Sequence, residues 1–140
     1  MSTILLVEDE PSILALMSEI LEPSGHTLLK ATAVDQAFHE FEEADANVDL
    51  VIADVNLPRT SGIRLALELR SLLPNLSIVL TSGHTPDMWN KEDLAELNEL
   101  PFDSVGVLQK PFLPSTLLHM VSRFVSLPSR PGMALAKAAS

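Results

Sequence analysis

The chain has 140 residues, 46% of them apolar, which suits one compact domain with a hydrophobic core. It contains no cysteine, which excludes disulfides and cysteine-based metal or redox sites, and no apolar stretch is long enough to span a membrane. A formal net charge of −10 argues against binding to nucleic acid or anionic lipid, so we expect a protein partner or a cation. Because the start MSTILLVEDE lacks the features of a signal peptide, we expect a cytoplasmic location.

In the first half of the chain, short apolar runs alternate with segments of helical period. Residues 4–7 predict a first strand, and apolar residues at helical spacing then continue until Pro23 and Gly25. Residues 27–31 predict a weaker second strand, and residues 50–53 predict a third. The helix predicted between them has an apolar face formed by Val34, Ala37, Phe38 and Phe41.

The second half continues the alternation. Ser61 can cap a leucine-rich third helix ending near Pro74 and Asn75, and residues 77–80 predict a fourth strand. From 83 to 103 we expect a loop and a helix containing Leu94, Leu97 and Leu100. Residues 105–108 predict a fifth strand, followed by a last helix through Leu117, Val121 and Phe124. Residues 127–140 are rich in Pro, Ala and Ser, and we expect a flexible tail there.

Five strand–helix pairs in alternation imply an α/β fold, a parallel sheet with helices on both faces. In such sheets, functional sites form at the carboxyl ends of the strands. The residues at those predicted ends are Glu8 and Asp9, then Asp54, then Thr81 and Ser82, and finally Lys110.

The three carboxylates predicted at this edge, those of Glu8, Asp9 and Asp54, would repel one another and require a cation. Oxygen ligands without His or Cys favour a hard ion, and a small open site suits Mg²⁺. A metal, an ammonium group and a hydroxyl around one carboxylate are what phosphoryl transfer requires, and that carboxylate can be the nucleophile.

The segments ILLVEDE, DVNLPRTSG, VLTSG and QKPF, in this order and spacing, resemble the receiver domain of two-component response regulators of the chemotaxis-regulator kind. The resemblance covers residues 3 to about 126, and it implies a flavodoxin-like, doubly wound sheet with strand order 2-1-3-4-5. We therefore expect a receiver domain over residues 1–126, followed by the tail. Met1 lies directly before the first strand, so we expect a natural start. The chain would then be a stand-alone receiver or a phosphate sink within a relay, and a piece of a larger hybrid kinase is the alternative.

The resemblance also implies roles for single residues. Asp54 would accept a phosphoryl group from a sensor histidine kinase or phosphotransfer protein. Thr81 would be the switch hydroxyl, and Lys110 would contact the phosphoryl group and precede a cis bond to Pro111. Mg²⁺ would be bound by Asp9 directly, by Glu8 through water and by the main-chain carbonyl of Asn56, and Asp54 belongs to the same metal site.

For the whole chain, the resemblance implies a signalling phosphoacceptor and not an enzyme with turnover. Its output would pass by contact to a downstream protein effector, and a homodimer is possible.

The sequence departs from this family at two places. Receivers commonly carry an aromatic residue three positions before the lysine, where this chain has Val107, so the aromatic readout cannot operate. The interval from Thr81 to Lys110 also looks longer than usual. In it, Met88 and Trp89 are either anchors for a partner or, in the case of Trp89, a pin that holds a long loop to the domain.

Other interpretations remain open. Thr81 and Ser82 could serve only as caps of the following segment. A degenerate receiver could act as a phosphorylation-independent binding module. A haloacid-dehalogenase-like phosphohydrolase also uses an Asp nucleophile with Mg²⁺, but it resembles D-x-D where this chain has Asn56. The four histidines lack the spacing of zinc ligands.

Overall fold

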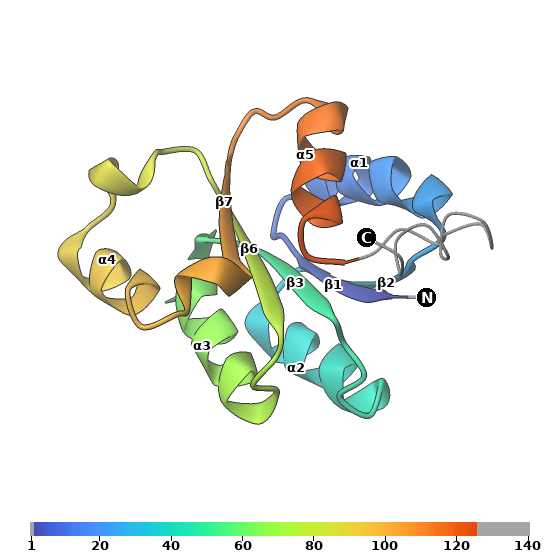
Figure 1. Ribbon diagram of the computed structural model, residues 1–140, viewed down its shortest axis with the longest axis horizontal. Coiled ribbons are helices and arrows are strands. Elements are labelled where there is room, and N and C mark those ends of the chain that lie inside the picture. The colour runs from blue at the N-terminus through green and yellow to red at the C-terminus, as the bar shows by residue number, and fades with distance from the viewer. Residues whose placement is uncertain (1, 126–140) are drawn as a thin grey trace, which may run out of the picture.

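A computed structural model describes residues 2–125, and its centre is a five-stranded parallel sheet (Figure 1). The order across the sheet is β2-β1-β3-β6-β7. The strand bounds are β1 Thr3–Val7, β2 Thr27–Ala31, β3 Leu50–Asp54, β6 Ser77–Ser82 and β7 Val105–Gln109. Since β4 and β5 form a separate hairpin, this is the predicted order 2-1-3-4-5, and the predicted fold class is confirmed.

Helices cover both faces of this sheet (Figure 1). One face carries α1, which spans Pro11–Leu21, and α5, which spans Pro114–Ser122. The other carries α2, which spans Val34–Glu43, and α3, which spans Gly62–Leu72, with α4, Lys91–Leu97, beside α3. Single turns of 3₁₀ helix lie at η1 Glu22–Ser24, η2 Pro86–Met88 and η3 Phe102–Ser104.

The period-2 alternation of strand side chains divides the core into two layers. In β1, Ile4 and Leu6 pack with α1 and α5, whereas Leu5 and Val7 pack with α2 and α3. All four are fully buried, as expected for a central strand with helices on both faces. These buried strands fix the edge of the sheet at which the polar residues emerge.

Local signals explain where several helices begin. The Ser61 hydroxyl accepts a hydrogen bond from the Arg64 main-chain N–H at 3.1 Å, so Ser61 is the predicted cap of α3. Asn90 caps α4 in the same way, through a 2.8 Å bond from the Asp93 N–H. A proline begins both α1 and α5, where its missing N–H costs nothing.

The structure differs from the sequence-based expectation in the second half of the chain. β6 runs on to Ser82, so Thr81 and Ser82 lie in the strand, where pairing with β7 continues. The helix expected around Leu94–Leu100 ends at Leu97, and Leu100 is buried just beyond it. α5 ends at Ser122, so Phe124 packs on the core from outside the helix.

A small antiparallel hairpin, β4 (Asn56–Leu57) with β5 (Thr60–Ser61), was not predicted. Its turn places Arg59 at φ 72°, in the left-handed region that few non-glycine residues adopt. The hairpin connects the end of β3 to the start of α3. It therefore lies next to the candidate site.

Two further points concern the C-terminal tail and the presence of membrane-spanning helices. The predicted flexible tail, 127–140, lies outside the described residues, as does the boundary at residue 126. In the described part of the chain, no helix has both the length and the apolar character needed to cross a bilayer.

Candidate functional site

The sheet brings the predicted site residues together at one edge. Glu8 and Asp9 directly follow β1, and Asp54 is the last residue of β3. Thr81 lies beside Asp54 in the parallel register of β3 and β6. Lys110 follows β7, and its main-chain N–H donates to the Ser82 carbonyl at 2.8 Å. The predicted convergence of strand ends is therefore present.

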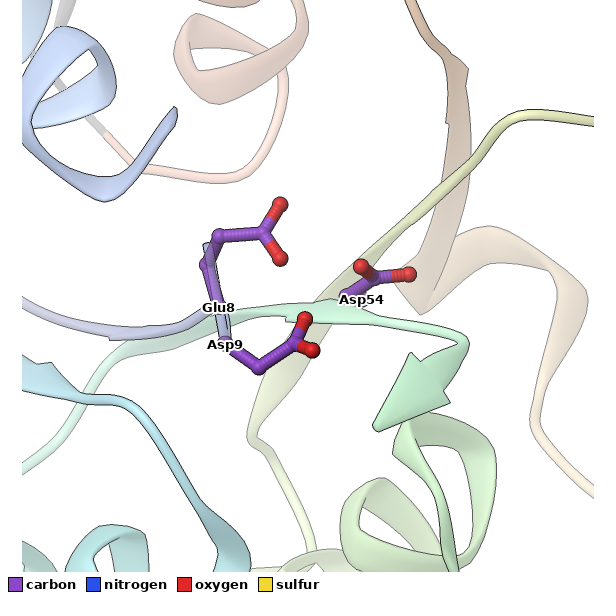
Figure 2. Close-up of side chains that lie close together, drawn as sticks. All are labelled: Glu8, Asp9 and Asp54. Carbon is purple, nitrogen blue, oxygen red and sulfur yellow. The ribbon is translucent and has the colours of Figure 1, made fainter. Parts of the chain in front are cut away.

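Three carboxylates form the centre of this edge (Figure 2). One carboxylate oxygen from each of Glu8, Asp9 and Asp54 lies within 4.8 Å of the others. Glu8 is 1% exposed and Asp54 is 6% exposed, whereas Asp9 is open to solvent. The Oε2 atom of Glu8 is buried without a hydrogen-bond partner among the described residues. A buried charged oxygen without a partner is costly, so this donor set fits a cation.

Lys110 partly balances that charge. Its Nζ atom lies 2.8 Å from Asp54 Oδ2 and 2.5 Å from Glu8 Oε1, so it joins two buried carboxylates. Its peptide bond to Pro111 is cis, as the family resemblance implied. One ammonium against three carboxylates leaves the site with an excess of negative charge.

Burial and pairing shift the protonation of this cluster. Burial raises the pKa of Glu8 to about 7, although the hydrogen bond from Lys110 opposes the rise. Burial alone would lower the pKa of Lys110, but hydrogen bonds to Asp54 and Glu8 outweigh it and raise that pKa. Lys110 is therefore charged at neutral pH, and Glu8 is the carboxyl that burial penalises most clearly.

The main chain also holds Asp54. The Asn56 N–H donates to Asp54 Oδ1 at 2.9 Å, while the Asn56 side chain faces solvent. The Val55 N–H donates to the Thr81 carbonyl at 2.9 Å, which extends the pairing of β3 and β6 past the carboxylate. Thr81 itself is 1% exposed. The Asp54 carboxylate is therefore held by the main chain just after it, at the end of a strand that pairs with β6.

Ser82 takes part in the turn that follows β6. Its hydroxyl accepts a hydrogen bond from the His84 main-chain N–H at 3.1 Å. The interpretation of Ser82 as a cap of the following segment therefore agrees with the structure.

Gly62 is a residue that the sequence analysis did not single out. A Cβ atom at Gly62 would lie 2.1 Å from the main-chain oxygen of Asp54 and 2.8 Å from its carbonyl carbon. The N-terminus of α3 thus packs directly against the backbone of the carboxylate residue. The final glycine of DVNLPRTSG was the available signal, because a glycine beside a buried strand often marks a close backbone approach.

The contacts of Trp89 bear on whether this residue anchors a partner or pins the long loop after β6 to the domain. Trp89 is half-buried, packs against the core cluster that contains Ile63, and donates its Nε1–H to the His84 carbonyl at 3.1 Å. These contacts are those of a residue that pins the loop to the domain. Met88 is 68% exposed and makes no comparable contact within the core clusters. Val107 is half-buried in β7.

A cleft of about 880 Å³ lies between the hairpin after Asp54 and helix α4. Asp9 and Asn56 line the end next to the carboxylates, and Arg59, Arg64, Asp93 and Glu96 line the remainder. Among the described residues, Glu8, Asp9 and Asp54 form the one group of His or acidic side chains arranged to hold a metal.

Comparison with known proteins identifies the family. Residues 4–122 match the family model described as "Response regulator receiver domain". The chain belongs to the response regulator receiver domain family. It is thus a receiver domain of two-component systems, a phosphoacceptor and a signalling module rather than an enzyme in the usual sense.

Curated relatives of this receiver domain agree. It is 33% identical over 128 residues to the two-component response regulator PprB of Pseudomonas aeruginosa, covering 89% of this chain and 44% of PprB. It is 32% identical over 127 residues to the sensor kinase CckA of Brucella abortus, covering 87% of this chain and 13% of CckA. The receiver domain therefore spans less than half the length of either relative.

Solved structures show the same architecture. The chemotaxis protein CheY4 of Vibrio cholerae is 28% identical and superimposes with a TM-score of 0.75, covering 89% of this chain and 99% of CheY4. Receiver domains generally bind Mg²⁺ at an acidic pocket, and here the acidic cluster is that of Glu8, Asp9 and Asp54. They pair with sensor histidine kinases or phosphotransfer proteins and can dimerise.

Proposed function

We propose that this receiver domain is phosphorylated on Asp54 by a sensor histidine kinase or phosphotransfer protein, in a reaction that depends on Mg²⁺. The observation that carries the proposal is the position of the Asp54 carboxylate, which lies beside two further carboxylates and 2.8 Å from the Lys110 ammonium. A nucleophilic carboxylate surrounded by groups that bind anionic oxygens is suited to phosphoryl transfer.

The residues fit a magnesium ion. Glu8, Asp9, Asp54 and the main-chain carbonyl of Asn56 would hold it, and the buried, unpartnered Oε2 of Glu8 supports a cation here. When bound, Mg²⁺ neutralises charge on the oxygens of the transferring phosphoryl group. Cation binding also favours the ionised form of Glu8, whose pKa burial otherwise raises.

In the transfer, one Asp54 carboxylate oxygen forms a bond to phosphorus while the bond from phosphorus to the donor's histidine nitrogen breaks. The product is an acyl phosphate at the end of β3. Lys110 would bind the new phosphoryl oxygens, exchanging part of its contact with Glu8 for them. Thr81, the neighbour of Asp54 in the sheet, is the proposed switch hydroxyl.

The output is proposed to pass by protein contact to a downstream effector, and a homodimer is one form such contact can take. Because Val107 replaces the usual aromatic, the change should appear mainly in the loop after β6 and in α4. The cytoplasmic location stays a prediction from the sequence.

The proposal is tested by the intact mass of the chain after incubation with a small acyl-phosphate donor, with and without Mg²⁺. The wild type should gain one phosphoryl group in Mg²⁺ only, and Asp54→Asn should gain none. Asp49→Asn is a matched control, because Asp49 lies just before β3, at the other end of that strand, and should react like the wild type. An unreactive wild type would favour the phosphorylation-independent binding module.

A further inference from the structure

Helix α4 is weakly attached to the domain. It is seven residues long and none of its residues is buried, whereas the ten- and eleven-residue helices each bury at least two. Leu97 and the preceding Trp89 contribute partly buried contacts to the core cluster that contains Ile63. A short helix with little buried surface can change position at small cost.

Polar contacts join α4 to the start of α3. Arg64 Nη1 lies 2.9 Å from Glu96 Oε2, and Glu96 is 17% exposed in its side chain. One turn earlier in α4, Asp93 lines the same cleft as Ser61. Burial raises the pKa of the Asp93 carboxyl. Ser61 caps α3 through the N–H of Arg64, so the Arg64–Glu96 pair starts from the helix terminus that Ser61 caps.

That terminus is tied directly to Asp54. The Gly62 N–H donates to the Val55 carbonyl at 2.9 Å, and Gly62 touches the main-chain oxygen of Asp54. The hairpin leaves β3 at Asn56, whose N–H binds the Asp54 carboxylate, and returns to the helix at Ser61. A shift at the carboxylate therefore reaches Ser61 and Arg64 through a short run of paired backbone.

We propose that the pair of Arg64 in α3 and Glu96 in α4, at the helix terminus capped by Ser61, forms a latch that holds α4 in place and couples its position to the state of Asp54. The inference rests on the proposed function, since it assigns the route by which phosphorylation of Asp54 is read. The latch would pass the signal on without the aromatic residue that this chain lacks at position 107, where it has Val107. The cleft beside the latch leaves space into which α4 and the hairpin can move.

The chain carries its own reporter of this movement. Trp89 is the one tryptophan in the sequence, and it lies just before α4, half-buried against the same core cluster as Leu97. Its fluorescence should therefore change when α4 changes position. The probe is beryllofluoride with Mg²⁺, a mimic of the phosphoryl group, titrated into the full chain.

Two neutralising variants test the latch, Arg64→Gln and Glu96→Gln. Each should reach the half-maximal Trp89 signal at a beryllofluoride concentration about two- to fivefold lower than the wild type, the range over which one exposed ion pair shifts an equilibrium. The exchange Arg64→Glu with Glu96→Arg should return the midpoint toward that of the wild type. Lys30→Gln removes the Lys30–Glu22 pair, away from α4, and should leave the midpoint unchanged.

Equal midpoints in all variants, or a shift of the same size in Lys30→Gln, would overturn the latch. So would a Trp89 signal that does not respond to beryllofluoride. The acyl-phosphate mass assay, run in parallel, separates the two claims. An adduct on Asp54 without a latch effect contradicts only the latch, whereas no adduct contradicts the proposed function and the latch with it.

Discussion

Gly62 and Asp54 are in direct backbone contact, and a Cβ at Gly62 would lie 2.1 Å from the Asp54 main-chain oxygen. The atom it would meet is backbone, which cannot rotate away as a side chain can. The same glycine begins α3, so the helix and Asp54, the proposed phosphoacceptor, are positioned by one contact. This relationship makes Gly62 a positioning residue for Asp54.

Gly62→Ala should displace the end of β3 or the start of α3. We expect a loss of about 1–3 kcal/mol in the free energy of unfolding, the usual cost of overpacking. We also expect acyl-phosphate adduct formation at least about tenfold slower than in the wild type, since small misplacements of reacting groups are costly. Urea unfolding and the mass assay measure the two effects.

Gly106→Ala provides the control for general destabilisation. A Cβ at Gly106 would lie 2.6 Å from Met120 Sδ and 3.1 Å from a ring carbon of Phe124, in the contact of β7 with α5. The Met120 side chain is flexible and the Phe124 ring must move only slightly, so this variant should lose less stability than Gly62→Ala and should form the adduct at the rate of the wild type. If both variants slow the reaction equally, Gly62 has no special role in positioning Asp54.

The buried Glu8 carboxyl should make the metal-free protein less stable as pH rises. Its folded pKa is raised to about 7 from an ordinary 4.5, so the folded state holds this proton more tightly than the unfolded state. The stability that this proton contributes is lost as pH rises from 4.5 to 7. At pH 8 with a chelator, Glu8→Gln should therefore be more stable than the wild type by roughly 1–3 kcal/mol.

The comparison is made by urea unfolding at pH 5 and pH 8, taking the difference between variant and wild type at each pH. Adding Mg²⁺ at pH 8 should stabilise the wild type more than Glu8→Gln, because a cation compensates the ionised carboxylate. Glu19→Gln, on the exposed side of α1, controls for loss of one negative charge. If Glu8→Gln and the wild type differ in unfolding free energy by the same amount at both pH values, Glu8 is not the group that lowers stability as pH rises.

His26 lies at the opposite end of the sheet from the three carboxylates, and it should make the folded protein less stable in acid. It is 7% exposed, and neither ring nitrogen has a hydrogen-bond partner among the described residues. Burial lowers its pKa below 6.5, although the charge of Asp49 opposes this. The unfolded state therefore takes up a proton first, and stability falls as pH drops below 6.5.

His26→Leu removes the titratable imidazole and places an apolar side chain in the same buried position. Its advantage over the wild type, measured by thermal unfolding, should grow as pH falls from 7 to 5. The exposed His39 is the matched control, and His39→Gln should follow the wild-type curve. Parallel curves for His26→Leu and the wild type would exclude His26 as the acid-sensitive group.

Trp89 and Met88 are neighbours with different roles. Truncating the half-buried Trp89 should cost about 1–3 kcal/mol of unfolding free energy, because its ring packs on the core and its indole N–H binds the His84 carbonyl. Met88→Ala should change stability by less than about 0.5 kcal/mol, since its side chain is exposed. Equal losses for the two variants in urea unfolding would contradict the interpretation of Trp89 as a pin.

The sequence was sufficient to predict the parallel sheet and the residues at its carboxyl edge. Buried runs such as Leu50–Asp54 are strongly apolar, and the polar residues that end them stand out, so Asp54 and Lys110 were found from pattern alone. The family resemblance then supplied the strand order. These predictions depend on local periodicity, which the tertiary structure did not override.

Other features depend on contacts between distant residues and were not predicted. The end of α4 at Leu97 follows from how Leu100 packs into the core, and the Arg64–Glu96 pair joins two helices far apart in sequence. The close approach of Gly62 to Asp54 needs a backbone geometry that hydrophobic patterning does not contain. The burial that raises the pKa of Glu8 is likewise a property of the assembled sheet edge.

The most direct test asks which of the three clustered carboxylates carries the phosphoryl group. Trypsin separates them, because cleavage after Lys30 and Arg59 releases the fragment 31–59 with Asp54, while Glu8 and Asp9 stay in the N-terminal fragment. After treatment with an acyl phosphate and Mg²⁺, mass spectrometry of the fragments should find the phosphoryl group on 31–59. Its presence on the fragment with Glu8 and Asp9, or its absence from both, would contradict the assignment of Asp54 as the phosphoacceptor.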